Sequence, residues 1–204
     1  MSEKKKIALT FDDGPTIGIT DQILDTLEKY GARASFFLIG NRVTPENEYL
    51  IKRAMSLGCS IENHTFTHPF LTRLTDAEIV EEVSKTTELI TNITNTPPLF
   101  FRPPFIDVNE KLYELIDLTF ICGRASNDWI PTADADTRFD LIMKAAEDGA
   151  IILVHDMPGN TPTVEAVKRV IPALMEQGYE FVNVREIFDK PGKQIDHKVM
   201  YSEF

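Results

Sequence analysis

Long apolar segments are absent from this chain. No uninterrupted apolar run in its 204 residues comes near the ~20 residues that a membrane-spanning helix needs. The charged start, residues 1–6, leads directly into a β-rich segment and lacks the apolar centre of a signal peptide. We therefore expect neither a signal peptide nor a membrane span within this sequence, and its residues do not fix a cellular location.

Cysteines and basic residues are also scarce. The two cysteines, Cys59 and Cys122, lack the spacing of a metal site, and we expect them to be reduced core residues near strand starts. Lys and Arg together number 21 against 32 Asp and Glu, which gives a net charge of −11. This balance disfavours nucleic acid and anionic membranes as partners and suits a neutral substrate.

The chain also lacks internal repeats, low-complexity stretches and a glycine-rich phosphate loop. Its length and its 43% hydrophobic content are enough for one well-buried core, so we expect a single domain over residues 1–188. Residues 189–204 contain Pro191, Gly192 and mixed charges, and we expect a tail or the start of a linker there. His197 lies in this segment without partner spacing and is expected to be an ordinary surface residue.

Short β-rich runs alternate with helical patterns from end to end. The predicted strands are 6–11, 34–39, 60–63, 99–102, 120–124, 150–154 and 180–184. The predicted helices are 19–30, 45–57, 76–91, 109–118, 137–147 and 163–177. Thr75 and Glu78 form a capping box, and glycines follow several helices where a left-handed cap is needed: Gly31, Gly58, Gly149 and Gly178. The pattern predicts a closed or nearly closed β/α barrel of seven units, with an open doubly wound sheet as the alternative.

Histidine is rare, and its distribution indicates chemistry. The chain has four histidines, and two of them, His64 and His68, are four residues apart, a spacing that suits chelation of one ion. Asp12 and Asp13 end the first predicted strand, and His155 ends another. The carboxyl ends of the strands in a β/α barrel share one face, so we expect these residues to meet there.

Two imidazoles and one carboxylate leave room for water and substrate at a metal ion, which is the arrangement of a catalytic site. The second carboxylate would be free to act as a base, and His155 is a candidate acid. Arg102 lies in a proline-stiffened segment, where its guanidinium could bind a carboxylate while the Phe105 amide faces an oxyanion. Phe105 and Trp129 could wall a small pocket.

These residues resemble the polysaccharide deacetylases of carbohydrate esterase family 4, also called the NodB homology domain. The resemblance covers residues 6–188 and rests on five ordered motifs. The first is Thr10-Phe11-Asp12-Asp13-Gly14-Pro15 and the second is His64-Thr65-Phe66-Thr67-His68. The third is Arg102-Pro103-Pro104-Phe105, the fourth ends in Asp128-Trp129, and the fifth is Leu153-Val154-His155.

The resemblance implies a distorted barrel with fewer than eight units and a hydrolase that removes acetyl groups from sugars. It implies a divalent ion, zinc or cobalt, with nickel as a third choice, held by Asp13, His64 and His68. Asp12 would be the base, oriented by Arg102, and His155 would protonate the leaving group. The substrate would contact Phe105, Trp129 and Leu153. A polymeric substrate further suggests action outside the cell.

Two departures from the family pattern bear on the substrate. Phe105-Ile106 stands where Tyr-Gly is usual, which removes a hydroxyl contact to the sugar. Ala125 stands where an Asp usually tunes the catalytic histidine, so we expect His155 to lack a carboxylate partner and to be a weaker acid. Because an amine leaving group depends more on protonation than an alkoxide does, this argument favours O-acetyl esters, as on xylan.

Three alternatives stay open at this point. An N-deacetylase of chitin or peptidoglycan would use the same residues on an amide. A hydrolase of cyclic amides or imides has a similar fold, but its first motif tends to lose the aspartates that are present here. A carbohydrate-binding pseudoenzyme is supported only by Ala125.

Overall fold

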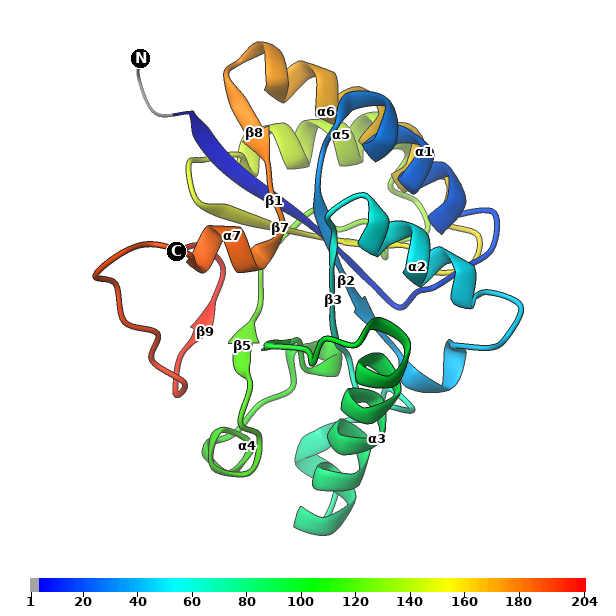
Figure 1. The fold of residues 1–204 in the computed structure, drawn as a ribbon. Coiled ribbons are helices and arrows are strands. Elements are labelled where there is room, and N and C mark those ends of the chain that lie inside the picture. Colours follow the sequence, from blue (N-terminus) through cyan, green and yellow to red (C-terminus); the bar gives the residue numbers. More distant parts are fainter. Residues whose placement is uncertain (1–3) are drawn as a thin grey trace.

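The computed structural model describes residues 4–204 as a curled half barrel of parallel strands with helices outside it (Figure 1). The strand order is β6-β7-β1-β2-β3-β4-β5-β9, and β8 also pairs with β1. The strands are β1 Lys5–Asp12, β2 Ala34–Leu38, β3 Ser60–Asn63, β4 Phe100–Phe101, β5 Thr119–Ile121, β6 Arg124–Ala125, β7 Ala150–His155, β8 Tyr179–Phe181 and β9 Met200–Tyr201. The expected distorted seven-unit barrel in a single domain is therefore confirmed, and the open doubly wound sheet is not formed.

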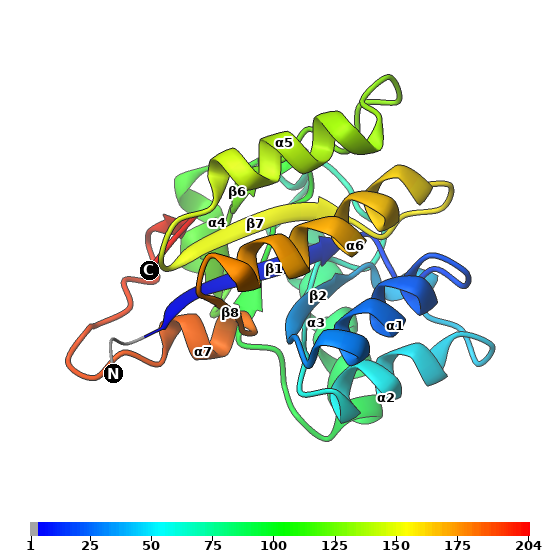
Figure 2. The same cartoon turned by 90° about the horizontal axis from the view of Figure 1, so that it is seen from above.

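The helices follow the strands around the outside of the barrel. They are α1 Thr20–Tyr30, α2 Glu48–Ser56, α3 Asp76–Thr94, α4 Glu110–Leu115, α5 Ala135–Ala145, α6 Thr161–Glu176 and α7 Val184–Phe188. Figure 2 shows α5, α6, α1 and α2 in succession along the outer side of β7, β1 and β2. None of these helices is long and apolar enough to cross a membrane.

Local sequence signals place most helix ends correctly. The capping box of Thr75 and Glu78 is formed at the start of α3. The glycines expected after helical segments all have positive φ angles, a conformation that costs glycine little because it has no Cβ. Cys59 and Cys122 are both free, and His197 is exposed.

Two predicted strands differ in the structure. Residues 120–124 form two short strands, β5 and β6, which lie at separate positions in the sheet and are divided at Gly123 (φ 89°). The predicted strand 180–184 ends at Phe181, and α7 follows at once because Asn183 caps it. The sequence analysis did not predict α7.

The C-terminal segment completes the barrel wall, where a tail or linker was expected. The Cys122 amide donates to the carbonyl of Tyr201 at 2.7 Å, and the Ile151 amide donates to that of Ser202 at 3.0 Å. Phe204 N donates to Gly149 O at 3.2 Å. Residues 200–204 thus bridge β5 and β7, because those two strands leave backbone groups that need partners.

The alternation of β1 separates the outer core from the barrel interior. Ile7, Leu9 and Phe11 belong to the apolar layer under the helices, whereas Ala8 belongs to a second cluster packed on α7. Side chains of a strand alternate between faces, so Thr10 and Asp12 share the inner face with Ala8. The α7 end of the barrel is therefore filled with apolar side chains, and polar groups gather at the opposite end.

Candidate active site

A cavity of about 390 Å³ opens at the carboxyl ends of the strands, and we call it the rim cavity. It contains nearly all the residues that the sequence analysis singled out, as expected from the shared edge of parallel strands. The lining residues are Asp12, Asp13, His64, His68, Pro103, Phe105, Ile106, Trp129, Leu153, His155 and Met157.

Asp13, His64 and His68 form a cluster suited to a metal ion. Each contributes one ligand atom, and these atoms lie within 4.8 Å of one another. Asp13 Oδ1 is 3.5 Å from Nε2 of both histidines and is buried without a hydrogen-bond partner among the described residues. A buried carboxylate oxygen without a donor is costly, and a divalent cation would satisfy it. The donor set of one oxygen and two imidazole nitrogens therefore fits zinc or a similar ion.

Tight turns bring the three side chains together. Asp13, Thr65 and His68 all have left-handed backbones, with φ angles of 76°, 67° and 62°. The chain thus turns at Asp13 itself, which is why two successive aspartates face the same cavity although they would diverge on a regular strand. Strained residues of this kind persist where the surrounding structure holds them.

Glu82 on α3 holds the turn between the two histidines. Its Oε2 accepts hydrogen bonds from the amides of Phe66 (2.9 Å) and Thr67 (2.7 Å), and its Oε1 accepts one from the Thr67 hydroxyl. The sequence analysis did not identify this residue, because a glutamate on an amphipathic helix gives no signal of such a contact. Its position explains how an irregular segment keeps a fixed shape.

The surroundings of His64 leave one ring nitrogen free for a metal. Its Nδ1 lies 2.6 Å from the Arg102 carbonyl, which requires that Nδ1 carry the proton and leaves the Nε2 lone pair facing Asp13. Burial lowers the pKa of His64 to about 3, although the charge of Asp13 opposes this. A histidine that stays neutral is the form that binds a metal ion.

Asp12 is paired with a buried arginine. Arg102 Nη1 donates to Asp12 Oδ1 at 2.6 Å and Nη2 donates to the Thr10 hydroxyl at 2.8 Å, with the guanidinium fully buried. Burial raises the pKa of Asp12 above its ordinary value, and the Arg102 charge opposes that rise. The predicted contact between Arg102 and Asp12 is therefore present, and Asp12 Oδ2 lies 3.7 Å from His64 Nε2.

The expectation that His155 lacks a carboxylate partner is wrong. Asp128 Oδ1 lies 2.7 Å from His155 Nδ1, and Asp128 Oδ2 accepts the His155 amide at 2.7 Å. The loop after β6 turns at Asn127 (φ 56°) and carries the buried Asp128 carboxylate to the position that Ala125 cannot fill. Burial lowers the pKa of His155, but the hydrogen bond and charge of Asp128 outweigh it and raise that pKa to about 9.

Aromatic and aliphatic side chains wall the rim cavity. Trp129 meets His155 edge-on at 5.9 Å between ring centroids, and Phe105 meets His68 at 4.6 Å. Phe70, which the sequence analysis did not select, stacks on Phe105 at 4.0 Å. Leu153 is nearly buried and lines the same cavity. The predicted walls at Phe105, Trp129 and Leu153 are thus assembled around the polar groups.

A family model described as polysaccharide deacetylase matches residues 1–121, which is more than half of the chain. The chain belongs to the polysaccharide deacetylase family. The resemblance drawn from the five motifs is therefore confirmed.

Individual members of this deacetylase family are similar over almost the whole chain. A bifunctional xylanase/deacetylase from Pseudobutyrivibrio xylanivorans is 41% identical over 198 residues, covering 96% of this chain and 33% of the relative. A peptidoglycan-N-acetylmuramic acid deacetylase from Bacillus subtilis is 36% identical, covering 90% of this chain and 39% of the relative. The chain thus spans between a third and two fifths of the length of these two relatives.

A solved structure of the family matches this fold closely. It is a family 4 acetyl xylan esterase from Clostridium thermocellum in complex with a cobalt ion, with a TM-score of 0.93 and 38% identity. The match covers 98% of both chains.

The first motif of this chain contains a glycine, Gly14, at a place where a Cβ would collide with a neighbouring side chain. A Cβ built on Gly14 would lie 2.2 Å from Asp156 Oδ2, because the Asp156 carboxylate packs directly against the Gly14 backbone. Asp156 also accepts a hydrogen bond from the Thr20 hydroxyl at 2.5 Å, and burial raises its pKa to about 7. The missing side chain at Gly14 thus lets the backbone of the first motif pack closely against Asp156, the residue after His155.

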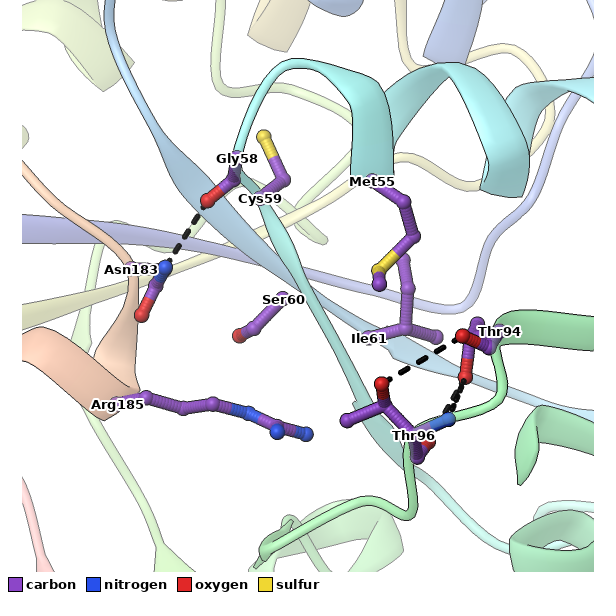
Figure 3. A pocket seen from close by; sticks show the side chains of 9 residues that line it. All are labelled: Met55, Gly58, Cys59, Ser60, Ile61, Thr94, Thr96, Asn183 and Arg185. Carbon is purple, nitrogen blue, oxygen red and sulfur yellow. Dashed lines mark hydrogen bonds between the residues drawn. The ribbon is translucent and has the colours of Figure 1, made fainter.

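A second cavity, of about 240 Å³, lies away from the deacetylase motifs, beside the start of β3 (Figure 3). Its polar side chains are engaged with one another or with the backbone. Asn183 Nδ2 donates to the Gly58 carbonyl at 3.0 Å, and Arg185 donates to Glu62 and to the Pro97 carbonyl. None of the residues that line the rim cavity lines this second cavity.

Proposed function

We propose that this chain is a metal-dependent carbohydrate deacetylase that removes O-acetyl groups from a xylan-type polysaccharide. The observation that carries the proposal is the joint placement of three devices in one cavity. The Asp13, His64 and His68 cluster, the Asp12–Arg102 pair and the His155–Asp128 pair face the same space. A hydrolase of acyl groups needs a metal or oxyanion site, a base and an acid within reach of one carbon atom.

Asp13, His64 and His68 would hold the ion. When bound, the ion supplies Lewis acidity that activates water and polarises the acetyl carbonyl. Asp12 accepts the proton of the attacking water, and Arg102 holds its carboxylate in one orientation. The Phe105 amide donates to the oxygen on which negative charge develops. These roles divide the two aspartates of the first motif between metal binding and proton transfer.

His155 donates the proton to the leaving sugar oxygen. Its Nδ1 proton is held by Asp128, so the second ring nitrogen, Nε2, faces the rim cavity as the acid. Because its pKa is raised to about 9, His155 carries the required proton at neutral pH. Trp129 and Leu153 form the apolar wall that receives the acetyl methyl group and excludes water.

The preference for O-acetyl esters is supported by the rim of the cavity and by the relatives. Phe105 offers an apolar ring without a hydroxyl group, and 55% of its surface is exposed. Two relatives are named as a xylanase/deacetylase and an acetyl xylan esterase. Because Asp128 is a carboxylate partner of His155, a weakened acid gives no support to the ester preference.

N-deacetylation of chitin or peptidoglycan sugars is the second candidate. The Asp128–His155 pair favours it, since a well-held protonated imidazole can protonate an amine leaving group. The peptidoglycan deacetylase from Bacillus subtilis is a relative of that kind. A cyclic imide hydrolase is not supported, because both aspartates of the first motif are present. A pseudoenzyme is not supported, because the proposed acid, base and metal cluster all face one cavity.

Acetate release on a substrate panel separates the two candidates. Acetylated xylan, N-acetylated chitooligosaccharides and peptidoglycan should be compared with zinc, cobalt and nickel supplied in turn. We expect kcat/KM on acetylated xylan to exceed that on both amides by at least about tenfold, because an alkoxide leaves more readily than an amine. Higher kcat/KM on either amide would refute the ester preference, and no release from any substrate would refute the deacetylase itself.

The pH dependence of turnover should report the His155–Asp128 pair. The acid form of His155 is present below its raised pKa and is lost as the pH rises through about 9, so activity should fall there. In Asp128→Asn the neutral amide no longer raises this pKa while burial still lowers it, so the alkaline limb should move to lower pH. A pH profile of kcat on acetylated xylan from pH 5 to 10 measures the shift. An unchanged limb would show that another group provides the acid.

A further inference from the structure

Arg138 on α5 is a buried cation without an anionic partner in direct contact. The residue is 3% exposed, and among the described residues its guanidinium bonds to neutral oxygens and forms no ion pair with a carboxylate. The guanidinium instead donates from Nε to the Ala133 carbonyl at 2.9 Å and from Nη1 to Thr163 Oγ1 at 2.7 Å. Nη1 also donates to Asn160 Oδ1. Burying a charge in this way is unfavourable unless polar groups compensate it.

The two side chains that accept from Arg138 both donate to Asp128. The Thr163 hydroxyl donates to Asp128 Oδ2 at 2.8 Å, and Asn160 Nδ2 donates to the same oxygen at 3.1 Å. The positive charge of Arg138 and the negative charge of Asp128 thus face each other across two polar side chains. The carboxylate in turn holds His155 Nδ1.

Arg138 determines the direction of these hydrogen bonds. A threonine hydroxyl has one proton, so when Nη1 occupies a lone pair of Thr163 Oγ1, that proton is left to point at Asp128. An asparagine amide can be rotated by half a turn, and Arg138 favours the orientation with Oδ1 toward itself and Nδ2 toward Asp128. The His155 carbonyl, which accepts from Asn160 Nδ2 at 2.8 Å, favours the same orientation. Without Arg138, the Thr163 hydroxyl could donate elsewhere, and Asn160 Oδ1 would lose its donor.

We infer that Arg138 is a positioning residue for His155, acting through Thr163, Asn160 and Asp128. It fixes the donors that keep the Asp128 carboxylate in the orientation that holds His155 Nδ1. The other charged groups that act on His155 are Asp12, at the end of β1, and Asp13, the residue after it. Neither is among the hydrogen-bond partners of the Asp128 carboxylate. The inference rests on the proposed role of His155 as the acid.

A purely structural role is the competing explanation, because Arg138 also connects α5 to the start of α6. Arg169 offers a matched control for that role. It lies on α6 and donates to Asp136 of α5 at 2.5 Å, and its guanidinium carbon lies 4.5 Å from the centroid of the Phe139 ring of α5. It therefore joins the same two helices outside the Asp128 network.

The test compares Arg138→Met, Arg138→Lys and Arg169→Met as metal-loaded proteins on acetylated xylan oligosaccharides. We expect Arg138→Met to lower kcat by about 10- to 100-fold, the range of losses when a supporting hydrogen-bond partner is removed. KM should change less than about twofold, since the substrate does not touch Arg138. Arg138→Lys should recover much of kcat, and Arg169→Met should retain it. Equal kcat in Arg138→Met and wild type, with only a lower Tm, would overturn the inference.

Two further measurements keep the inference testable if Arg138→Met fails to fold or if acetate release is absent. Thr163→Val removes one connecting hydroxyl with little change in shape, and it should lower kcat in the same direction. Nitrogen NMR of the zinc-loaded, histidine-labelled protein, recorded at a pH above the raised pKa of His155 where the ring is neutral, reports the His155 tautomer without turnover. We expect Nδ1 protonation in wild type and a mixed tautomer in Thr163→Val. An unchanged His155 signal in Thr163→Val would refute the positioning role, whereas a wild type that releases no acetate would refute only the proposed function.

Discussion

Replacing Asp12 with asparagine is expected to lower kcat by about a thousandfold while the metal stays bound. General bases contribute about 10²- to 10⁴-fold, and Asp12 is the carboxylate of the first motif that lies outside the proposed metal cluster of Asp13, His64 and His68. Asparagine keeps the size of the side chain and an oxygen that accepts from Arg102 Nη1, but it cannot take a proton from water. Initial rates of acetate release and metal content by mass spectrometry measure the two quantities.

Asp25→Asn is the matched control for this change. Asp25 lies on α1 at the surface, with 65% of its side chain exposed, and pairs with Arg53 there. This variant should retain wild-type turnover. The Asp12 variant should be somewhat less stable, because the buried Arg102 loses its counter-charge. Turnover within tenfold of wild type in folded Asp12→Asn would exclude Asp12 as the base.

Replacing Asp13 with asparagine is expected to remove metal binding and, with it, nearly all activity. Asparagine tolerates the left-handed backbone of Asp13 (φ 76°), so the turn should survive. The buried Oδ1 that faces both histidines becomes a neutral amide group and no longer supplies the negative charge of the cluster. We expect the affinity for Zn²⁺ to fall by more than about 100-fold, which is the upper range for loss of a supporting residue alone.

Calorimetric titration of metal-free protein with Zn²⁺ measures this loss. The same Asp25→Asn variant controls for a general change in charge, and it should bind Zn²⁺ as wild type does. High metal concentration should restore part of the activity of Asp13→Asn but none of that of Asp12→Asn, since only the first defect lies in metal binding. Equal Zn²⁺ affinity in Asp13→Asn and wild type would disprove the assignment of Asp13 as a ligand.

Features that depend on neighbouring residues in the sequence could be predicted well. The capping box at Thr75, the glycines after helices and the alternation of strands and helices are local signals, and the structure contains them except at Gly149, which lies beyond the end of α5 and does not cap it. The meeting of Asp13, His64 and His155 at one cavity followed from a general rule, since carboxyl ends of parallel strands share an edge.

Features that depend on the path of an irregular segment could not be predicted from the sequence. The spacing of the fourth motif pointed to Ala125 as the place of the His155 partner, but the left-handed turn at Asn127 brings Asp128 there instead. Glu82 and Arg138 act through contacts between elements that are distant in sequence, and neither residue type nor spacing indicates such a contact.

The amino-acid sequence by itself determined the order of the elements, the family and most residues of the rim cavity. Periodicity, helix caps and motifs each depend on a few residues that are close together in the chain. The tertiary structure decided which groups surround those residues. It decided that Asp128 holds His155 and that residues 200–204 close the wall between β5 and β7. It also decided that the buried Arg138 contacts Asp128 through Thr163 and Asn160. Each of these contacts satisfies a buried polar group, and which partner satisfies it depends on the packing of the whole chain.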